Sequence, residues 1–458
     1  MLCVKIFPNP KRFVSKFQGA SAIEALGEGF YDRVAPADFN LVGVRYFDED
    51  LSRSIGLELS QDQLVDHFLR FEPLPGSLKT PLALRYHGHQ FRHYNPDIGD
   101  GRGFLFAQFM SGGKLLDFGT KGSGTTPFSR RGDGRLTLLG GVREVLAANY
   151  LHSLGVNTSR AFTLIETDEA LERHDEPSPT RAAVLTRLSH SHIRFGTFQR
   201  HAFYEDTDAL ERLSAYCIQH FYADTTTPEE MFDSVVTASA DTVASWMAAG
   251  FVHGVMNTDN MNITGESFDY GPYRFLPTLE PGYVAAYFDH GGLYAFGRQP
   301  DAMIWNLAQL AQCLSLITED QPLIDALDQF SDHYQSAINA RLIRRLGVKA
   351  RPNQDPSEFV KQTFTLLKDS QTPWPEFWHD WRGGADRASG KQSGDYKGAA
   401  WKDWQKALAE FEGVAERPQT DRPVSLLYDE IGALWKPIAA HDDWSLFKQK
   451  LSDIALAV

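Results

Sequence analysis

Four residues with charged or amide side chains follow one another along the chain in an order that suits phosphate chemistry. Lys121 closes the apolar segment KLLDFGTK, Glu144 follows it, and Asn260 and Asp269 come far downstream. A lysine can neutralise phosphate oxygens, and a glutamate can hold that lysine in one rotamer. Amide and carboxylate oxygens are hard ligands that Mg²⁺ accepts. The set therefore predicts a metal-assisted phosphate site.

Glycine-rich segments flank the lysine on both sides. IGDGRG (98–103) precedes it, and GSGTTPFSRRGDGR (122–135) follows it directly. Glycines let backbone N–H groups approach phosphates without a Cβ clash. Alone, the first segment is more often a plain turn, and a single Lys–Glu pair is usually solvated. The whole order of glycine loop, lysine, glutamate, asparagine and aspartate is that of a protein-kinase-like phosphotransferase.

The segment HGVMNTDNMN (253–262) departs from a kinase catalytic loop. Such a loop places an aspartate two residues after the histidine, where this chain has Val255. A carboxylate returns at Asp259, directly before Asn260. Taken alone, Asp259 is best interpreted as a loop residue that hydrogen-bonds its own backbone. The alternatives are an inactive kinase and a site in which the displaced carboxylate performs different chemistry.

Apolar spacing and capping residues predict the elements that position these side chains. Ser60 is the expected N-cap of a helix, and Gly155 and Gly250 are expected helix stops. The expected helices span 60–71, about 142–154 and 228–250, and residues from Met303 onward are expected to be mostly helical. The expected strands span 103–110, 114–121, 161–167, 182–188 and, with a turn, 283–292, whereas 368–401 is expected to be a loop.

These elements predict an α+β fold of the protein-kinase-like bilobal type. The expected division is an N-terminal extension at 1–80, a small β-rich N-lobe at 81–190 and a larger, mostly helical C-lobe at 191–458. The nucleotide loop belongs to the first lobe and the HGVMNTDN segment to the second.

The composition of the chain limits which binding partners and which cellular compartment we expect. The 458 residues are 42% hydrophobic and 23% charged, which is typical of a globular chain. The net charge of −14 argues against nucleic acid as a partner, so any anion needs a local basic pocket. No apolar run reaches membrane-spanning length, so no membrane partner is expected. Three dispersed cysteines without a CxxC motif favour a reducing, cytoplasmic location over a disulfide framework, and organellar import is the less favoured alternative.

Two further groups of residues invite functional interpretations that the sequence does not favour. His87, His89 and His93 lack matched acidic or cysteine partners at the spacing of a common zinc site. The C-terminal tryptophans are more consistent with packing than with a stacking platform for bases. They are Trp374, Trp378, Trp381, Trp401 and Trp404.

Longer strings give a more specific match. The chain resembles the selenoprotein O family, pseudokinases that transfer AMP to protein hydroxyls, from about residue 27 to about residue 310. The matching strings are GHQF (88–91), GDGRG (99–103), KGSGTTPFSRRGDGR (121–135), VRE (142–144), TRLSHSHIRFGTF (186–198), HGVMNTDNMNI (253–263) and DYGP (269–272). The resemblance implies that ATP is bound in a reversed orientation, so that its α-phosphate faces a Ser, Thr or Tyr hydroxyl of a protein substrate.

The same resemblance implies a role for individual residues. Asp259 would be the catalytic base, and Glu144 would orient Lys121. Mg²⁺, or Mn²⁺ in its place, would be held by Asn260 and Asp269. The residues that would grip the phosphates or line the nucleotide site are Gly99, Gly101, Arg102, Lys121, Asp133, Gly134, Arg187 and Arg194.

The chain also departs from the family pattern. It ends in LSDIALAV without a C-terminal cysteine, so redox regulation through such a residue is not expected. Arg92 follows GHQF where a glycine is usual, which would alter access to the nucleotide site. An ordinary kinase-like phosphotransferase and a non-catalytic pseudokinase scaffold are the alternative functions, and transfer of UMP instead of AMP stays open.

Overall fold

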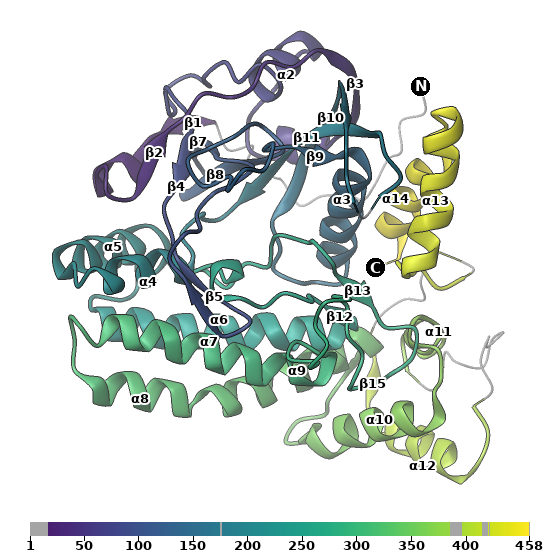
Figure 1. Ribbon diagram of the computed structural model, residues 1–458. Coiled ribbons are helices and arrows are strands. Elements are labelled where there is room, and N and C mark those ends of the chain that lie inside the picture. Colours follow the sequence, from purple (N-terminus) through teal and green to yellow (C-terminus); the bar gives the residue numbers. More distant parts are fainter. Residues whose placement is uncertain (1–16, 175, 385–395, 415–419, 421, 458) are drawn as a thin grey trace.

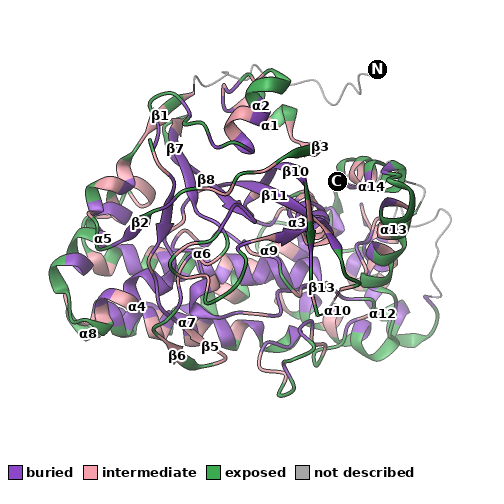
Figure 2. Ribbon diagram, turned by 45° about the horizontal axis from the view of Figure 1, so that its top comes forward, coloured by how far each residue is buried: buried purple, intermediate pink, exposed green. Residues whose placement is uncertain are grey.

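A large antiparallel sheet and a body of helices make up the molecule (Figure 1). The computed structural model describes residues 17–174, 176–384, 396–414, 420 and 422–457. Within them the chain is a mixed helix-and-sheet protein, as the sequence predicts at that level. Buried residues concentrate in the central strands and in the long helix α6 (Figure 2).

The large sheet has nine strands, and all its pairs are antiparallel. Its main order is β2-β4-β7-β8-β11-β10-β3, with β1 on β7 and β9 on β11. The strands predicted between 103 and 188 are confirmed, but the three that precede residue 80 were not predicted. The bounds are β1 Gln18–Ala20, β2 Tyr31–Arg33, β3 Leu41–Phe47, β4 Leu82–Leu84, β7 Leu105–Ser111, β8 Lys114–Lys121, β9 Leu136–Thr137, β10 Arg160–Leu171 and β11 Thr180–Ser189.

Helices cover both faces of this sheet. Side chains alternate between the faces, so Leu185 packs in the core that contains α3 while Val184 packs in the core that contains α2. On the α2 face, Phe68, Phe118 and Phe162 have ring centroids 4.7 to 5.3 Å apart. The predicted Ser60 cap is present and forms a capping box with Gln63. The helical segments here are η1 Ala22–Leu26, α1 Glu49–Ser54, α2 Gln61–Phe68 and α3 Leu138–Ser153.

The second part of the molecule is built around α6. This helix begins after the Thr227 cap with Pro228 in its first turn and ends at Gly250, whose φ of +69° is the left-handed conformation that glycine adopts easily. The predicted helix is thus confirmed. The other segments of this part are β5 Gly88–Gln90, β6 His93–Asn95, α4 Phe195–Phe203, α5 Thr207–Phe221, α6 Pro228–Ala249, β12 Phe251–Val252, η2 Thr258–Asn260, β13 Arg274–Phe275, η3 Phe296–Arg298, α7 Gln299–Leu314, α8 Asp320–Asp328 and α9 Phe330–Leu346.

The C-terminal segments lie in two places. The short helices α10 to α12 enclose the five tryptophans, all of which are buried, so the packing interpretation is confirmed. The last two helices lie beside α3 (Figure 1). The bounds are β14 Val348–Lys349, α10 Ser357–Ser370, α11 Trp374–Asp380, α12 Ala399–Leu408, β15 Glu412–Gly413, α13 Tyr428–His441 and α14 Ser445–Leu456.

Two predicted elements are wrong. The strand expected at 283–292 is a series of turns, in which the Asp289 carboxylate accepts hydrogen bonds from the backbone N–H groups of Leu293 and Tyr294, each at 2.8 Å. The loop expected at 368–401 contains α11 and the start of α12. Burial of Trp374, Phe377 and Trp378 on one face of α11 outweighs the local glycine and serine content; residues 385–395 lie outside the described part.

No helix among the described residues is long and apolar enough to cross a membrane. Cys217 and Cys313 are free and buried, and Cys3 lies outside the described residues.

The phenylalanine cluster on the α2 face gives a test of the core. Phe118 is fully buried and contacts rings from three other elements, so Phe118→Ala is expected to lower the free energy of unfolding by about 3–5 kcal/mol. Val42→Ala, at a position that is 50% exposed, is the control and is expected to change it by less than about 0.5 kcal/mol. Urea unfolding followed by tryptophan fluorescence measures both, and equal effects would contradict this description of the core.

Candidate functional site

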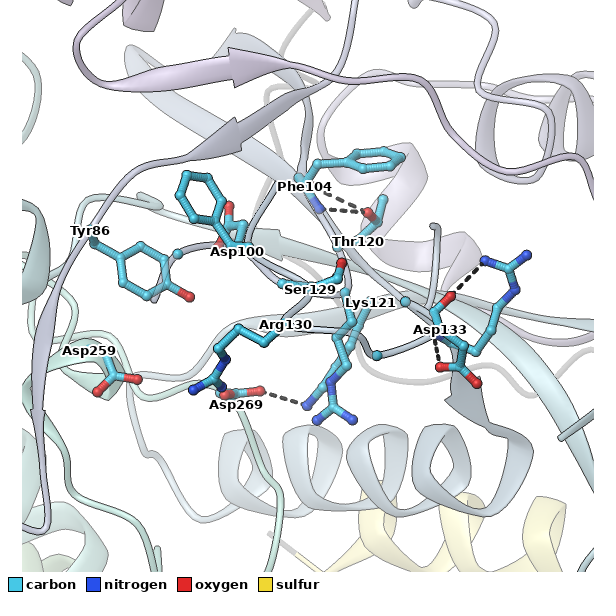
Figure 3. A pocket seen from close by; sticks show the side chains of 18 of the residues that line it. Tyr86, Asp100, Phe104, Thr120, Lys121, Ser129, Arg130, Asp133, Asp259 and Asp269 are labelled. Carbon is cyan, nitrogen blue, oxygen red and sulfur yellow. Dashed lines mark hydrogen bonds and ion pairs between the residues drawn. The ribbon is translucent and has the colours of Figure 1, made fainter. Parts of the chain in front are cut away.

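A cavity of about 760 Å³ lies between the sheet and the loop that follows α6 (Figure 3). Eight of its lining residues are basic and five are acidic, so it is locally positive in a chain of net charge −14. Eleven of the twelve predicted site residues line it, and the twelfth, Glu144, lies directly behind Lys121. The basic residues are Arg102, Lys121, Arg130, Arg131, Arg135, Arg173, Arg187 and Arg194.

A buried ion network ties three elements together at the floor of the cavity. Lys121, at the end of β8, donates hydrogen bonds to Glu144 on α3 and, at 2.6 Å, to Oδ1 of Asp269. Arg187 of β11 lies nearby, with its Nη1 3.6 Å from Glu144 Oε2 and 3.8 Å from Asp269 Oδ1. The Nε and Nη1 atoms of Arg187 have no hydrogen-bond partner among the described residues. The network therefore has donor capacity to spare for an anion.

Strand register explains why these cations meet. In the β8–β11 pair Lys121 lies opposite Leu185 and Gly119 lies opposite Arg187. Residues two apart on a strand share a face, so both cations point toward α3. Glu144 lies in the first half of α3 among other buried residues of that helix and is only 3% exposed. A charged residue buried at such a position requires a partner of opposite charge, which Lys121 provides.

Asp269 is held ionised by its surroundings. Burial opposes ionisation, but the combined field of Lys121, Arg187, Arg102 and Arg194 keeps the pKa of its carboxyl well below the usual range. Its backbone has a φ of +62°, uncommon for a residue other than glycine. An ionised carboxylate in this position is suited to bind a metal ion.

Arg194 links the two parts of the molecule. Its buried guanidinium donates to the backbone carbonyl of Asp259 at 2.7 Å and to the Asp100 carboxylate at 3.3 Å. It also lies over the rings of Tyr86 and Phe268, at 4.5 and 4.9 Å from their centroids. Arg194 thereby fixes the backbone at Asp259.

Asp259 lies in the short helical turn η2 and is 8% exposed. Burial raises the pKa of its carboxyl to about 6, against the opposing effect of Arg194. Its Oδ1 has no hydrogen-bond partner among the described residues. The alternative that Asp259 serves only as a loop cap leaves this oxygen unexplained, because a buried polar atom without a partner is costly.

A hairpin packs against the other side of Asp259. A Cβ added to Gly88 of β5 would lie 2.8 Å from Asp259 Oδ1, so a larger residue there would displace the Asp259 carboxylate. The backbone N–H of His89 donates to Thr258 Oγ1 at 2.7 Å and fixes the hairpin to the turn η2. The string GHQF carries the signal for this contact, which sequence reasoning did not assign.

Oxygen donors for a metal ion lie next to this carboxylate. Asn260 uses its side-chain N–H₂ to donate to the carbonyl of Val255 at 3.0 Å, which leaves its amide oxygen available. Together with Asp269 it offers the hard oxygen ligands that suit Mg²⁺, which takes few protein ligands and keeps several waters. These residues therefore fit the metal that the sequence predicts.

The two glycine-rich segments pack on one another at the roof of the cavity. A Cβ at Gly99 would lie 2.5 Å from the Phe128 ring, and one at Gly101 would lie 2.9 Å from the Phe128 carbonyl oxygen. Ser129 Oγ donates to the Gly101 carbonyl at 2.5 Å, and Gly134 has a φ of +69°. The glycines thus allow close packing of the loops as well as approach of a ligand.

Asp133 lines the cavity but has partners of its own. Its carboxylate forms an ion pair with Arg173 at 2.8 Å and accepts from the backbone N–H of Arg135 at 3.0 Å. These contacts position the loop of residues 122–135.

Sequence reasoning missed several lining residues. Arg130 and Arg131 are exposed, have positive φ values and extend from the loop, with Arg130 reaching into the cavity (Figure 3). Their signal was the doubled arginine inside a glycine-rich string. Asp100 lies in the glycine-rich string GDGRG but was not assigned a role, and Tyr86 carries no such signal, because a tertiary contact with Arg194 brings it to the site.

The histidines have other partners. His87 contacts Tyr94 and Arg200, and His89 contacts Gln199. Among the residues with described placement, no group of three or more His, Cys, Asp or Glu side chains could hold a metal ion.

Proteins of known class resemble this chain over most of its length. Three relatives are named protein nucleotidyltransferase YdiU. The one from Synechocystis sp. is 44% identical and aligns with 93% of this chain and 95% of its own length. The one from Gloeobacter violaceus is 43% identical over 93% and 92%, and the one from Vibrio vulnificus is 37% identical over 79% and 74%. With the basic cavity, these similarities define the chain as an enzyme of the nucleotidyltransferase class.

A family model narrows the class. The model described as "Protein adenylyltransferase SelO" matches residues 14–455. The chain belongs to this family, and the resemblance found in its motifs is confirmed.

The ion network generates a prediction about ligand binding. Glu144→Gln removes the negative charge that orients Lys121 and is expected to weaken nucleotide binding, measured with ATP as the probe, about tenfold, the loss typical of one charge-assisted hydrogen bond. Isothermal titration calorimetry measures the change. The matched control is Glu172→Gln, at an exposed position on the cavity rim, which is expected to bind ATP as the parent does. Equal affinities for the parent and Glu144→Gln would refute the role of this contact.

Proposed function

We propose that the chain is a protein adenylyltransferase that transfers AMP from ATP to Ser, Thr or Tyr hydroxyls of other proteins, with Mg²⁺ as the metal ion. The observation that carries the proposal is Asp259, a buried carboxylate with an unpartnered oxygen at the cavity. Val255 occupies the place where a kinase has its base. Membership of the family described as protein adenylyltransferases supports the same reaction.

The fold supports a kinase-like arrangement. In this proposal the large sheet with α3 would correspond to the small lobe of a kinase, and the helices around α6 would correspond to the large lobe. Lys121 on a strand, Glu144 on the next helix, and Asn260 and Asp269 further along the chain occur in the order that a kinase uses for ATP, and Lys121 contacts both Glu144 and Asp269.

The cations favour a triphosphate as the bound anion. Arginine forks match phosphate oxygens, and Arg187 has unpaired donors next to Lys121. With the β- and γ-phosphates on Lys121 and Arg187, the α-phosphorus would face Asp259. This is the reversed orientation that distinguishes transfer of AMP from transfer of the γ-phosphate.

Asp259 would accept the proton of the acceptor hydroxyl. The hydroxyl oxygen attacks the α-phosphorus, a new P–O bond forms, and the bond between the α-phosphorus and the oxygen that bridges to the β-phosphate breaks. Pyrophosphate leaves with that bond's electron pair. A carboxylate with a pKa of about 6 is mostly ionised at neutral pH and can still take up a proton as the attack proceeds.

Asn260 and Asp269 would hold the metal ion. When bound, Mg²⁺ would neutralise phosphate oxygens and so reduce charge repulsion during attack. Lys121 would keep Asp269 oriented, and Arg194 would keep the turn of Asp259 and Asn260 in place.

Other functions compete with this proposal. A γ-phosphotransferase would use the same cavity with ATP in the opposite orientation, and a scaffold would use no chemistry. The intact ion network around Asp269 and the strained backbone at that residue favour a catalytic site over a scaffold. We expect protein substrates and ATP as partners, no nucleic acid and no membrane, and activity in the cytoplasm.

Labelled ATP distinguishes the functions. Incubated with Mg²⁺ and a cell lysate, the parent is expected to leave label from [α-³²P]ATP, but not from [γ-³²P]ATP, on proteins. Asp259→Asn is expected to lower this labelling by about 100- to 10,000-fold, the range for loss of a general base. Asp224→Asn, at an exposed position that does not line the cavity, is the control and should retain the activity of the parent. Label from the γ position alone would overturn the proposal.

The pH dependence follows from the raised pKa of Asp259. The base form is lost as pH falls through about 6, so kcat/KM for a protein acceptor is expected to rise with pH up to about 6 and then level off. Below that point the slope should approach tenfold per pH unit. Rates measured between pH 5 and 8 in constant ionic strength test this, and a flat profile over that range would contradict the assigned base.

A further inference from the structure

A second cavity, of about 190 Å³, lies at the C-terminal end of α3 and shares no lining residue with the first. Its walls come from α3, α9 and α11. Four arginines line it: Arg341, Arg344 and Arg345 of α9, and Arg382, which follows α11. Such a concentration of one charge is unexpected in a chain of net charge −14.

These arginines have few negative partners. Arg341 forms an ion pair with Asp241, its Nε donating at 3.0 Å. Within the described ranges, Arg344, Arg345 and Arg382 form no ion pair with a carboxylate. Arg382 reaches only the backbone carbonyl of Arg345, at 3.5 Å.

Some of these arginines are explained by hydrogen bonds to carbonyl groups at the C-terminal ends of helices. Arg341 also donates to the carbonyl of Gly155, just past α3, and Arg345 donates to the carbonyl of Ala248 near the end of α6. Positive side chains are favourable at the C-terminal ends of helices. Arg344 lies in the last turn of α9 and Arg382 donates to the Arg345 carbonyl there, but no carboxylate among the described residues neutralises either guanidinium.

The cluster is electrostatically unfavourable as it stands. Burial and the nearby charge of Arg382 lower the pKa of Arg345 to about 10, and burial and Arg344 lower that of Arg382. A base whose pKa is lowered on folding destabilises the folded state while it stays charged. An anion in the cavity would remove this penalty.

The same cavity contains a hydrogen-bond donor, in the side chain of Trp378, that has no acceptor among the described residues. This donor is the indole Nε1–H, and Trp378 is only 5% exposed. The Arg345 guanidinium lies 4.6 Å from the centroid of the Trp378 ring. Guanidinium forks and an indole N–H are donors only, so the missing partner is an acceptor.

We propose that this cavity is a second anion site, which binds a small free phosphate anion of the orthophosphate or pyrophosphate type. Arg344 and Arg382 would bind phosphate oxygens as forks, and Trp378 would donate one further hydrogen bond. The volume is a quarter of that of the first cavity, which suits a small anion better than a nucleotide. A bound anion would fix the end of α3, the helix that carries Glu144.

Equilibrium dialysis of the full chain with [³²P]orthophosphate, in chloride buffer at fixed ionic strength, tests the proposal. The double variant Arg344→Ala/Arg382→Ala is expected to lose one phosphate per chain relative to the parent, or to bind it at least tenfold more weakly. Phosphate bound in the first cavity is unaffected by this variant, so the difference reports the second cavity alone. Unlabelled pyrophosphate as a competitor shows which of the two anions binds more tightly.

The control removes the same charge elsewhere. Arg212→Ala/Arg351→Ala changes two exposed arginines without ion pairs among the described residues and should bind phosphate as the parent does. Thermal unfolding without phosphate shows that the test variant folds, and its Tm should equal or exceed that of the parent because two unpaired charges are gone. Phosphate binding by Arg344→Ala/Arg382→Ala equal to that of the parent would overturn the proposal.

Discussion

The contact between Lys121, Glu144 and Asp269 holds the site together. It joins a strand, a helix and a distant loop through charges that are largely withdrawn from water. Each of these charges requires its partners, because removal of one member of a buried ion pair typically lowers the free energy of unfolding by about 3–5 kcal/mol. The order of these residues in the sequence therefore reflects a physical requirement: the sheet, α3 and the loop after η2 must meet at one point.

Around this contact the cavity carries more positive than negative charge. Arg187 has donors to spare, and Arg194 is committed to the backbone of Asp259 and to Asp100. An anionic substrate would neutralise the excess positive charge that the folded cavity retains. The carboxylates are differentiated as well: Asp269 is held ionised by four cations, whereas burial raises the pKa of Asp259 to about 6. Two neighbouring carboxylates with opposite pKa shifts are suited to different tasks, metal binding and proton transfer.

Local signals predicted much of this arrangement. Ser60, Thr227 with Pro228, and Gly250 mark helix ends through interactions within a few residues, so sequence alone places them. The strands that carry Lys121 and Arg187 also follow from apolar runs. The three strands before residue 80 were missed because β1 and β2 have only three residues each, and because pairing with distant strands, not local preference, stabilises them. The helix α11 was missed because burial of its aromatic side chains outweighs the surrounding glycines and serines.

As with the elements of the fold, only some residues of the site were predicted from the sequence. Motif strings supplied eleven residues that line the cavity, together with Glu144 behind them. Gly88 and Asp100 lie in the strings GHQF and GDGRG, but their contacts with Asp259 and Arg194 form only in the folded chain, and no local pattern marks Tyr86. The arginines of the second cavity were not predicted either, because α9 and the segment after α11 meet only in the folded chain.

The direction in which ATP lies decides between transfer of AMP and transfer of phosphate, and a crystal structure with a non-hydrolysable ATP analogue and Mg²⁺ shows it directly. We expect the α-phosphorus beside the Asp259 carboxylate, with the β- and γ-phosphates on Lys121 and Arg187. A γ-phosphorus beside Asp259, with the α-phosphate on Lys121, would contradict this expectation.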